Sequence, residues 1–538
     1  MIHKEIIFFL SVPVLAALSS LIIKDKKKIG KVQSICMIVL FFLGLNLIRE
    51  ILKSTNIVAF NNFIYLDALS GLMIFLISLV GTIASIYSIG YMTNEVEEKI
   101  HNIWKLKGYY VLFNIFILTM LLTVMVNSIG IIWIAIELTT LVSAFLVGYY
   151  NKEAPVEASW KYIILCTVGI AFAMIGIVLG YYAVTHTGGT KELGLNWNYL
   201  TTIAPELDPD LMKIAFVFIL IGFGTKAGLA PMHSWLPDAH SEAPTPVSAL
   251  LSGVLIKCGI YGIIRFAVIT NLAIGSLFTS KLILVFGLIS LGISVPFILI
   301  QKHIKRLLAY SSLEHIGIIA CGLGFANPIS VFGALFHMIN HAMVKSLMFF
   351  TAGNISLKFH SKDMEHIKGA IQLMPVSGIV LLVGGLALAG SPPFSIFLSE
   401  FYILCGGFEG NHWFASALFV LFLVIVFGGL THHLLQMALG EPNNLSNNKI
   451  KISKGEIGRS SILSLVIPLL MVCLLGVWIP GPLFKLITEA TKIITLDRTN
   501  SYAFTNHRIH PQVYIKNSVN PILLEGSADG SSSLSGAI

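Results

Sequence analysis

The chain has 538 residues, of which 56% are hydrophobic and 12% are charged, and its mean hydropathy is +0.84. Soluble domains carry about 25% charged residues, so this composition excludes a soluble globular protein and indicates a multi-pass protein of the cell (inner or plasma) membrane. The net charge of +8 comes from Lys and Arg in short loops between apolar runs, a topology signal that excludes a nucleic-acid-binding face.

Apolar runs long enough to cross about 30 Å of hydrocarbon predict about 14 transmembrane helices in an all-α polytopic fold. The first run is followed by the cationic stretch KDKKKIGK, whereas a signal peptide has its positive charges before the apolar run. We therefore expect the first run to be retained as a span. The runs lie near residues 6–23, 32–48, 66–90, 109–126, 129–150, 160–184, 211–231, 246–270, 280–301, 305–324, 330–352, 373–404, 413–437 and 460–480.

The basic loops follow odd-numbered runs, which predicts that they lie in the cytoplasm and that both termini face outward. The loop after the seventh run, HSWLPDAHSEAP, has neither Lys nor Arg. Its histidines and carboxylates indicate a working surface. After Pro482 the chain is first amphipathic and then polar, and the polar end is expected to be disordered.

Two runs contain prolines that should break a helix. Pro231 lies in TKAGLAPMHSW, and Pro392 and Pro393 lie in LALAGSPPFSIFLSE. Broken helices at membrane depth occur where they line a cavity or are buried in protein. Their separation by five helices predicts two inverted five-helix repeats, as in transporters. The alternative is a pair of ordinary proline kinks.

Five charged residues lie inside long apolar runs: Glu137, Lys226, Lys257, Lys345 and Glu400. Each would cost roughly 2.5–3.5 kcal/mol at the bilayer centre if it were unpaired. They must therefore pair or line water, and they are candidates for an ion or proton path. No charge within thirteen residues of Glu137 can pair with it, so Lys226 is its natural partner, and a contact between them that opens and closes would act as a switch. A static buried ion pair is the alternative.

His337, His341 and Lys345 are spaced four residues apart, so they should form one stripe along a helix. Histidine titrates near neutrality, and we interpret this stripe as a proton relay. We expect Lys257 to connect it to Lys226, and Glu400 to end the path.

Three further residues received minor predictions. His315 in SSLEHIG is an auxiliary candidate for the path, and the signal from the adjacent Glu314 is weak. Asp67 should cap or begin the third helix, an ordinary role.

The sequence predicts no metal and no cofactor on this chain. The histidine stripe lacks the Glu of H-E-x-x-H and any nearby thiolate. The cysteines stand singly in apolar runs, without the Cys-x-x-Cys spacing of zinc or iron–sulfur sites: Cys36, Cys166, Cys258, Cys321, Cys405 and Cys473. Any redox centre of a larger assembly would therefore belong to other chains.

The segment GFGTKAGLAPMHSWLPDAHSEAPTPVSALLSGVLIKCGIYGIIRF resembles the antiporter-like subunits of respiratory complex I, Mrp cation/proton antiporters and group 4 energy-converting hydrogenases. The likeness continues through AYSSLEHIG, HMINHAMVKSLMFFTAGNI and SPPFSIFLSEFYIL and spans roughly residues 60–440. It implies fourteen helices, with helices 4–8 and 9–13 as inverted repeats that each contain a broken helix.

The resemblance also implies roles for single residues. Glu137 is implied to be the carboxylate of helix five, Lys226 the lysine of the first broken helix, Lys257 the connecting lysine and Glu400 the charge of the second broken helix. The combination of Glu400 with a stripe of histidines and lysine looks most like the F-type subunits of hydrogenase-4 and formate-hydrogenlyase complexes. The second most similar type is subunit M of complex I.

From these features we divide the chain into five parts. They are three N-terminal helices (1–108), a first repeat (109–270), a second repeat (271–440), helix fourteen (441–482) and a polar C-terminal tail (483–538).

The leading hypothesis is a proton-translocating subunit of a redox-driven complex, whose partners are other membrane subunits and a peripheral arm with Fe–S, NiFe or flavin centres. One alternative is an Mrp-type Na⁺/H⁺ antiporter subunit without redox partners. Another is a scaffold whose buried charges only hold helices together.

Overall fold

A computed structural model of the chain describes residues 2–97, 102–441 and 453–496. Long helices α1 (Ile2–Ile22), α2 (Lys26–Ser54) and α3 (Ala68–Glu97) form the N-terminal part, and a short antiparallel hairpin of β1 (Ile57–Ala59) and β2 (Ile64–Leu66) joins α2 to α3. Asp25 begins α2 by accepting hydrogen bonds from the backbone N–H groups of Lys27 and Lys28 at 2.8 and 3.3 Å. These bonds lower the pKa of Asp25 and satisfy donors that a helix start leaves free.

The next part carries the first predicted break. α8 ends at Gly228, in the left-handed conformation at φ 79°, just before Pro231. Beyond it, α10, the π-helical turn η2 and α11 continue as one helix over Thr245–Ile274. In order, the elements are α4 (Ile103–Met125), α5 (Ile129–Val147), α6 (Glu153–His186), α7 (Trp197–Ile203), η1 (Ala204–Glu206), α8 (Pro209–Ala227), α9 (Trp235–Glu242), α10 (Thr245–Leu250), η2 (Leu251–Leu255) and α11 (Ile256–Ile274).

The last part carries the second break, between α16 and α17, at Gly390 to Pro393. The peptide bonds before Pro231 and before Pro393 are both cis. The elements are α12 (Leu277–Ile300), α13 (Ile304–Gly324), α14 (Pro328–Phe359), α15 (Ala370–Leu373), α16 (Pro375–Leu388), α17 (Ser395–Glu409), α18 (Trp413–Leu439), α19 (Arg459–Val477) and α20 (Gly481–Thr495).

Among the described residues, 11 helices are long and apolar enough to cross a membrane. The remaining predicted spans coincide with α8, α14 and the pair α16 and α17. In the sequence these segments carry the two proline breaks and the stripe of His337, His341 and Lys345. The all-α polytopic fold is thus confirmed, whereas the count of fourteen, the inverted repeats and the domain boundaries stay predictions.

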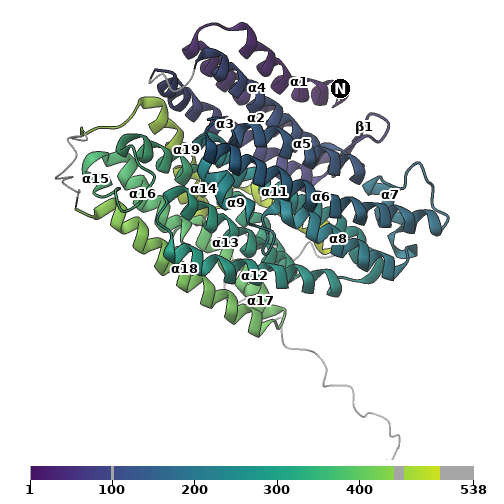
Figure 1. Cartoon of the computed structure of the whole chain (residues 1–538). Helices are drawn as coiled ribbons and strands as arrows, with labels where there is room; N and C mark the ends of the chain where they lie inside the picture. Colours follow the sequence, from purple (N-terminus) through teal and green to yellow (C-terminus); the bar gives the residue numbers. More distant parts are fainter. Residues whose placement is uncertain (1, 98–101, 442–452, 497–538) are drawn as a thin grey trace, which may run out of the picture. The chain divides into compact units, whose positions relative to one another are not determined.

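The most deeply buried spans are α10–α11 and α13, whose most apolar stretches are 100% buried, followed by α3 at 89%. α14 is also buried from Ser330 to Ile355 with little interruption. In Figure 1, α11, α13 and α14 lie in the middle of the view, between α1 at the top and α18 below. Each predicted broken helix packs on the span before it, α8 on α6 and α17 on α14. Lys257, Lys345 and the histidines therefore sit on the inner helices, whereas Glu137, Lys226 and Glu400 lie on α5, α8 and α17.

The C-terminal segment begins as predicted with an amphipathic helix, α20, which packs its apolar face on α3 and α14. The predicted disordered end, from residue 497, lies outside the described residues.

Candidate functional site

Lys257 on α11 meets the histidine stripe directly. Its Nζ lies 3.0 Å from Nδ1 of His341 on α14. The same ammonium donates to the backbone carbonyls of Gly253 at 2.5 Å and Ser252 at 3.3 Å. Both carbonyls belong to the π-helical turn η2, a feature that recurs at functional sites because it leaves carbonyls without their usual helical donors. The π turn thus holds Lys257 against His341.

His315, predicted only as auxiliary, lies at the centre of the cluster. Its Nδ1 is 2.9 Å from Nε2 of His337, and its ring centroid is 4.8 Å from that of His341. The His337 and His341 rings are 6.4 Å apart and share no hydrogen bond. His315, coming from α13, therefore bridges two histidines that the helical stripe alone leaves separated.

The cluster continues to the second broken helix, where Nδ1 of His337 lies 2.9 Å from Oγ of Ser399 on α17. We call the series Lys257, His341, His315, His337 and Ser399 the polar row. All five side chains are completely buried. The row thus joins α11, α13, α14 and α17 through the protein interior.

Glu400 lies beside His315 and His337 of the polar row. Its carboxylate and the ring nitrogens of His315 and His337 lie within 4.8 Å of one another, and Glu400 is 7% exposed. The carboxylate rests against Gly390 in the break, where an added Cβ would collide with Oε2. Gly390 also has φ 77°, so glycine both permits the turn and leaves space for the carboxylate.

We expect Gly390→Ala to disturb Glu400 strongly. The new methyl group would collide with the carboxylate, and the left-handed backbone would add about 1–2 kcal/mol of strain. Displacing a reacting group by about 1 Å can cost on the order of 100-fold in rate, so proton translocation should fall between about ten- and hundredfold. Reconstituted vesicles with a pH-sensitive dye would measure it. Gly428→Ala on α18, which has open space around its Cα, is the matched control; equal rates in both variants would contradict this role.

Lys345 does not continue the row as predicted from the spacing. Its Nζ donates to the carbonyl of Leu308 at 2.8 Å and to the hydroxyl of Ser311, both on α13. Glu314, on the next turn of α13, is 2% exposed, and its Oε2 has no hydrogen-bond partner among the described residues. The stripe therefore splits, with the two histidines in the polar row and Lys345 bound to α13.

Glu137 on α5 and Lys226 on α8 form no ion pair in the described structure. Lys226 Nζ donates to Oγ1 of Thr140 at 2.8 Å and to the hydroxyl of Tyr162 at 2.7 Å. Glu137 Oε1 accepts a 2.8 Å hydrogen bond from Thr167, and its Oε2 is buried without a partner among the described residues. The predicted direct contact is therefore absent, and the structure has the arrangement in which the two charges are apart.

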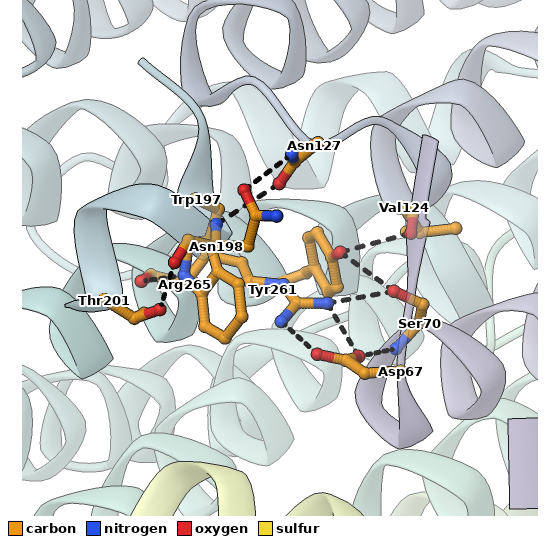
Figure 2. A network of polar contacts seen from close by, with 9 residues as sticks. All are labelled: Asp67, Ser70, Val124, Asn127, Trp197, Asn198, Thr201, Tyr261 and Arg265. Carbon is orange, nitrogen blue, oxygen red and sulfur yellow. Dashed lines mark hydrogen bonds and ion pairs between the residues drawn. The ribbon is translucent and has the colours of Figure 1, made fainter. Parts of the chain in front are cut away.

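A buried ion pair that the sequence analysis missed lies beyond Lys257 on α11 (Figure 2). Asp67 caps α3 as predicted, accepting from the N–H of Ser70 at 2.9 Å. It also binds both terminal nitrogens of Arg265, at 2.5 and 2.8 Å. The guanidinium stacks on the rings of Trp197 and Tyr261, with its central carbon 4.4 and 4.8 Å from their centroids. The spacing of Lys257, Tyr261 and Arg265, four residues apart, was the signal that could have revealed this polar face.

The HSWLPDAHSEAP segment forms α9, and its carboxylates are occupied by ion pairs. Asp238 contacts Arg306 at 3.2 Å and Lys161 at 3.5 Å, and Glu242 contacts Lys362 at 3.7 Å. These bases come from three other segments of the chain. The acidic residues of the predicted working surface therefore tie α9 to α6, to α13 and to the loop that contains Lys362.

Taken together, the geometry defines a polytopic membrane protein with ionisable side chains connected through its interior. The family described as NADH:quinone oxidoreductase/Mrp antiporter, TM, matches residues 126–426, and the N-terminal region described as NADH-ubiquinone oxidoreductase (complex I), chain 5, matches residues 54–100. The chain belongs to this family, which confirms the resemblance read from the sequence.

Several curated relatives are similar to the chain. The hydrogenase-4 component F homolog of Methylacidiphilum infernorum is 37% identical over 78% of this chain and 86% of that protein. Hydrogenase-4 component B of Escherichia coli is 35% identical over 63% of this chain and 50% of that protein. A Na⁺/H⁺ antiporter protein of Alkalihalophilus pseudofirmus is 33% identical over 63% of this chain and 42% of that protein.

Solved structures share the fold at lower identity. A chain of the archaeal membrane-bound sulfane sulfur reductase matches with a TM-score of 0.79 and 23% identity, covering 90% of this chain and 97% of that chain. A chain of the Mrp complex from Dietzia sp. DQ12-45-1b matches with a TM-score of 0.76 and 18% identity, covering 90% of this chain and 95% of that chain. Both likenesses concern the fold.

Proposed function

We propose that the chain is a proton-translocating membrane subunit of a redox-driven complex of the energy-converting hydrogenase type. One observation carries the proposal: the polar row from Lys257 to Ser399 runs through buried protein with neighbouring groups 2.9–3.0 Å apart or with rings in contact. The similarity to hydrogenase-4 components supports the proposal that the chain works in a complex with redox-active subunits.

The histidines suit proton transfer because each imidazole accepts a proton on one nitrogen and releases one from the other. Lys257 faces Nδ1 of His341, and His337 places its two nitrogens toward His315 and Ser399. A proton entering at Lys257 would therefore pass to His341 and, by rotation of the His341 and His315 rings that lie in contact, to His315. From there it would reach His337 and Glu400, whose ligand atoms lie within 4.8 Å of that of His315. Ring rotation and exchange of tautomers would then reset the row.

Glu137 and Lys226 form a gate before the Lys257 end of the polar row. In the present arrangement hydroxyl groups, not Glu137, hold Lys226. Rotation of Lys226 from Thr140 toward Glu137 would convert the separated state into an ion pair. Such a step moves the positive charge of Lys226 from the hydroxyl groups to Glu137 and offers a switch between holding and passing a proton.

Movement of a proton against a membrane potential costs about 2.3 kcal/mol per 100 mV. We propose that other membrane subunits and a peripheral arm with Fe–S and NiFe or flavin centres supply this energy, that this chain holds no cofactor, and that its basic loops face the cytoplasm. The similar proteins come from several kinds of complex. Purification of the native assembly would identify the subunits that bind the electron donor.

An Mrp-type Na⁺/H⁺ antiporter subunit is the second candidate, because a Na⁺/H⁺ antiporter protein is 33% identical to the chain. The chemistry of the polar row favours protons. Hard cations prefer oxygen ligands, whereas the row consists of one ammonium, three imidazoles and one hydroxyl.

The test of the proposed function is Lys257→Met in the complete complex, reconstituted in vesicles. We expect proton translocation to fall by about 100-fold or more, the contribution typical of a positioned proton carrier, and to be independent of Na⁺. Lys281→Met, on the exposed face of α12, should leave it unchanged. Wild-type proton transfer per electron in the Lys257 variant, or a requirement for Na⁺, would reject the proposal.

A further inference from the structure

An apolar cavity of about 610 Å³, lined by none of the residues of the polar row, lies between α2, α19 and α20. Its lining includes Leu45 and Leu52 of α2, Phe75 of α3, Leu474 of α19 and Leu486 of α20. The volume falls within the roughly 300–1,000 Å³ of ordinary ligand sites. A groove of this kind takes an apolar chain.

Three cations stand at the rim of this groove: Arg49, Lys53 and Lys485. The Arg49 side chain is exposed and has no ion pair or hydrogen bond with any described residue. Lys53 pairs with Glu50 at 2.7 Å, and Lys485 donates to a backbone carbonyl, that of Leu52, at 3.3 Å. Glu50 is the one carboxylate paired with these three cations, so the rim keeps a net positive charge. The rim therefore complements an anion.

The position of the groove matches the boundary between hydrocarbon and water. α19 ends at Val477, and the following Trp478 is 59% exposed, as expected for an aromatic residue at the headgroup level. α20 follows directly after α19, with Leu486, Ile487 and Ala490 buried against α3 and α14 and with Lys485 at the groove. The apolar floor thus reaches into the hydrocarbon, and the cations stay at headgroup height.

From these observations we infer that the groove binds a membrane phospholipid with an anionic headgroup, with one acyl chain in the cavity and the phosphate between Arg49, Lys53 and Lys485. A neutral lipid would fill the apolar floor but leave the positive rim without a counter-charge. A partner helix without acidic residues would desolvate the same cations without pairing them, which is costly. The inference is independent of the proposed function.

The experiment uses the complete complex in phosphatidylcholine vesicles that contain a trace of photoactivatable phosphatidylglycerol or photoactivatable phosphatidylcholine. Phosphatidylglycerol should label peptides of α2, α19 and α20, and phosphatidylcholine should label them several-fold less. Neutralising Arg49, Lys53 and Lys485 with Gln should lower the phosphatidylglycerol signal by about fivefold for each cation, since a basic side chain near an anionic membrane contributes about 1 kcal/mol.

Two further variants make the result decisive. Leu474→Trp fills the groove from a side chain that is already 50% exposed, so the fold should tolerate it while labelling by both lipids falls. Lys213→Gln, which removes an exposed cation elsewhere on the chain, should change nothing. Equal labelling by both lipids, unchanged labelling in the triple Gln variant, or a cross-link from this groove to another subunit would overturn the inference.

Discussion

Proton translocation by the reconstituted complex should fall by about 100-fold or more when His315 is replaced by Leu, while the complex still assembles. His315 bridges His337, whose Nε2 is 2.9 Å away, and His341, whose ring is 4.8 Å away. Leucine fills similar space but carries no proton. Positioned acid–base groups typically contribute 10²–10⁴-fold, which sets the expected size. The measurement is proton uptake per electron transferred, so a lower quantity of assembled complex does not mimic the effect.

A matched control is His433→Leu on α18, because His433 lies outside the polar row, where its Nε2 contacts the carbonyls of Ile298 and Leu299. We expect wild-type pumping there. His315→Ala is a second test. Its smaller side chain leaves space for water or added imidazole, and added imidazole should restore part of the proton translocation. Normal proton-to-electron ratios in His315→Leu would show that the histidines serve only to pack α13 against α14.

Asp67→Asn should lower stability by about 3–5 kcal/mol, the usual result of leaving one member of a buried ion pair alone. Both side chains are only 3% exposed, and Arg265 would lose its counter-charge inside the protein. The midpoint of heat-induced loss of the intact complex, followed by size-exclusion chromatography, measures the effect. Asp210→Asn is the control, because the Asp210 side chain is 86% exposed in its ion pair with Lys213 and such pairs contribute about 0–1 kcal/mol.

The double variant Asp67→Asn with Arg265→Gln should recover part of the loss, since it removes both charges and leaves none unpaired. Pumping per assembled complex should stay close to wild type, because the pair lies outside the polar row. A double variant as unstable as Asp67→Asn would show that the stacking of Arg265 on Trp197 and Tyr261, and not its charge, holds α3, α7 and α11 together.

Much of the fold could be predicted because the bilayer restricts what a chain can do. Each predicted apolar run falls on a helix, since a segment in hydrocarbon must satisfy its own backbone groups. The breaks were also visible, since proline cannot continue the hydrogen-bond pattern, and the helices are interrupted before Pro231 and at Pro392 and Pro393. The family and the membrane location follow from the same segments and are confirmed.

The candidate site was only partly predictable. The sequence identified Lys257, His337, His341 and Glu400, since buried charges in apolar runs are rare. It gave His315 a minor role, extended the stripe to Lys345, and joined Glu137 directly to Lys226. It also offered no sign of the π turn that supplies the carbonyls for Lys257. These differences concern distances of a few ångströms between helices.

By itself, then, the amino-acid sequence determined which segments form long apolar helices, where the chain breaks at prolines and which side chains must avoid lipid, because transfer into hydrocarbon is a property of each segment alone. Only the tertiary structure decided which of those side chains touch. The rotation of α13 against α14 places His315 between two histidines, and the approach of α11 to α3 gives Asp67 its arginine. Such contacts depend on side-chain packing between helices, and spacing along one helix cannot specify them.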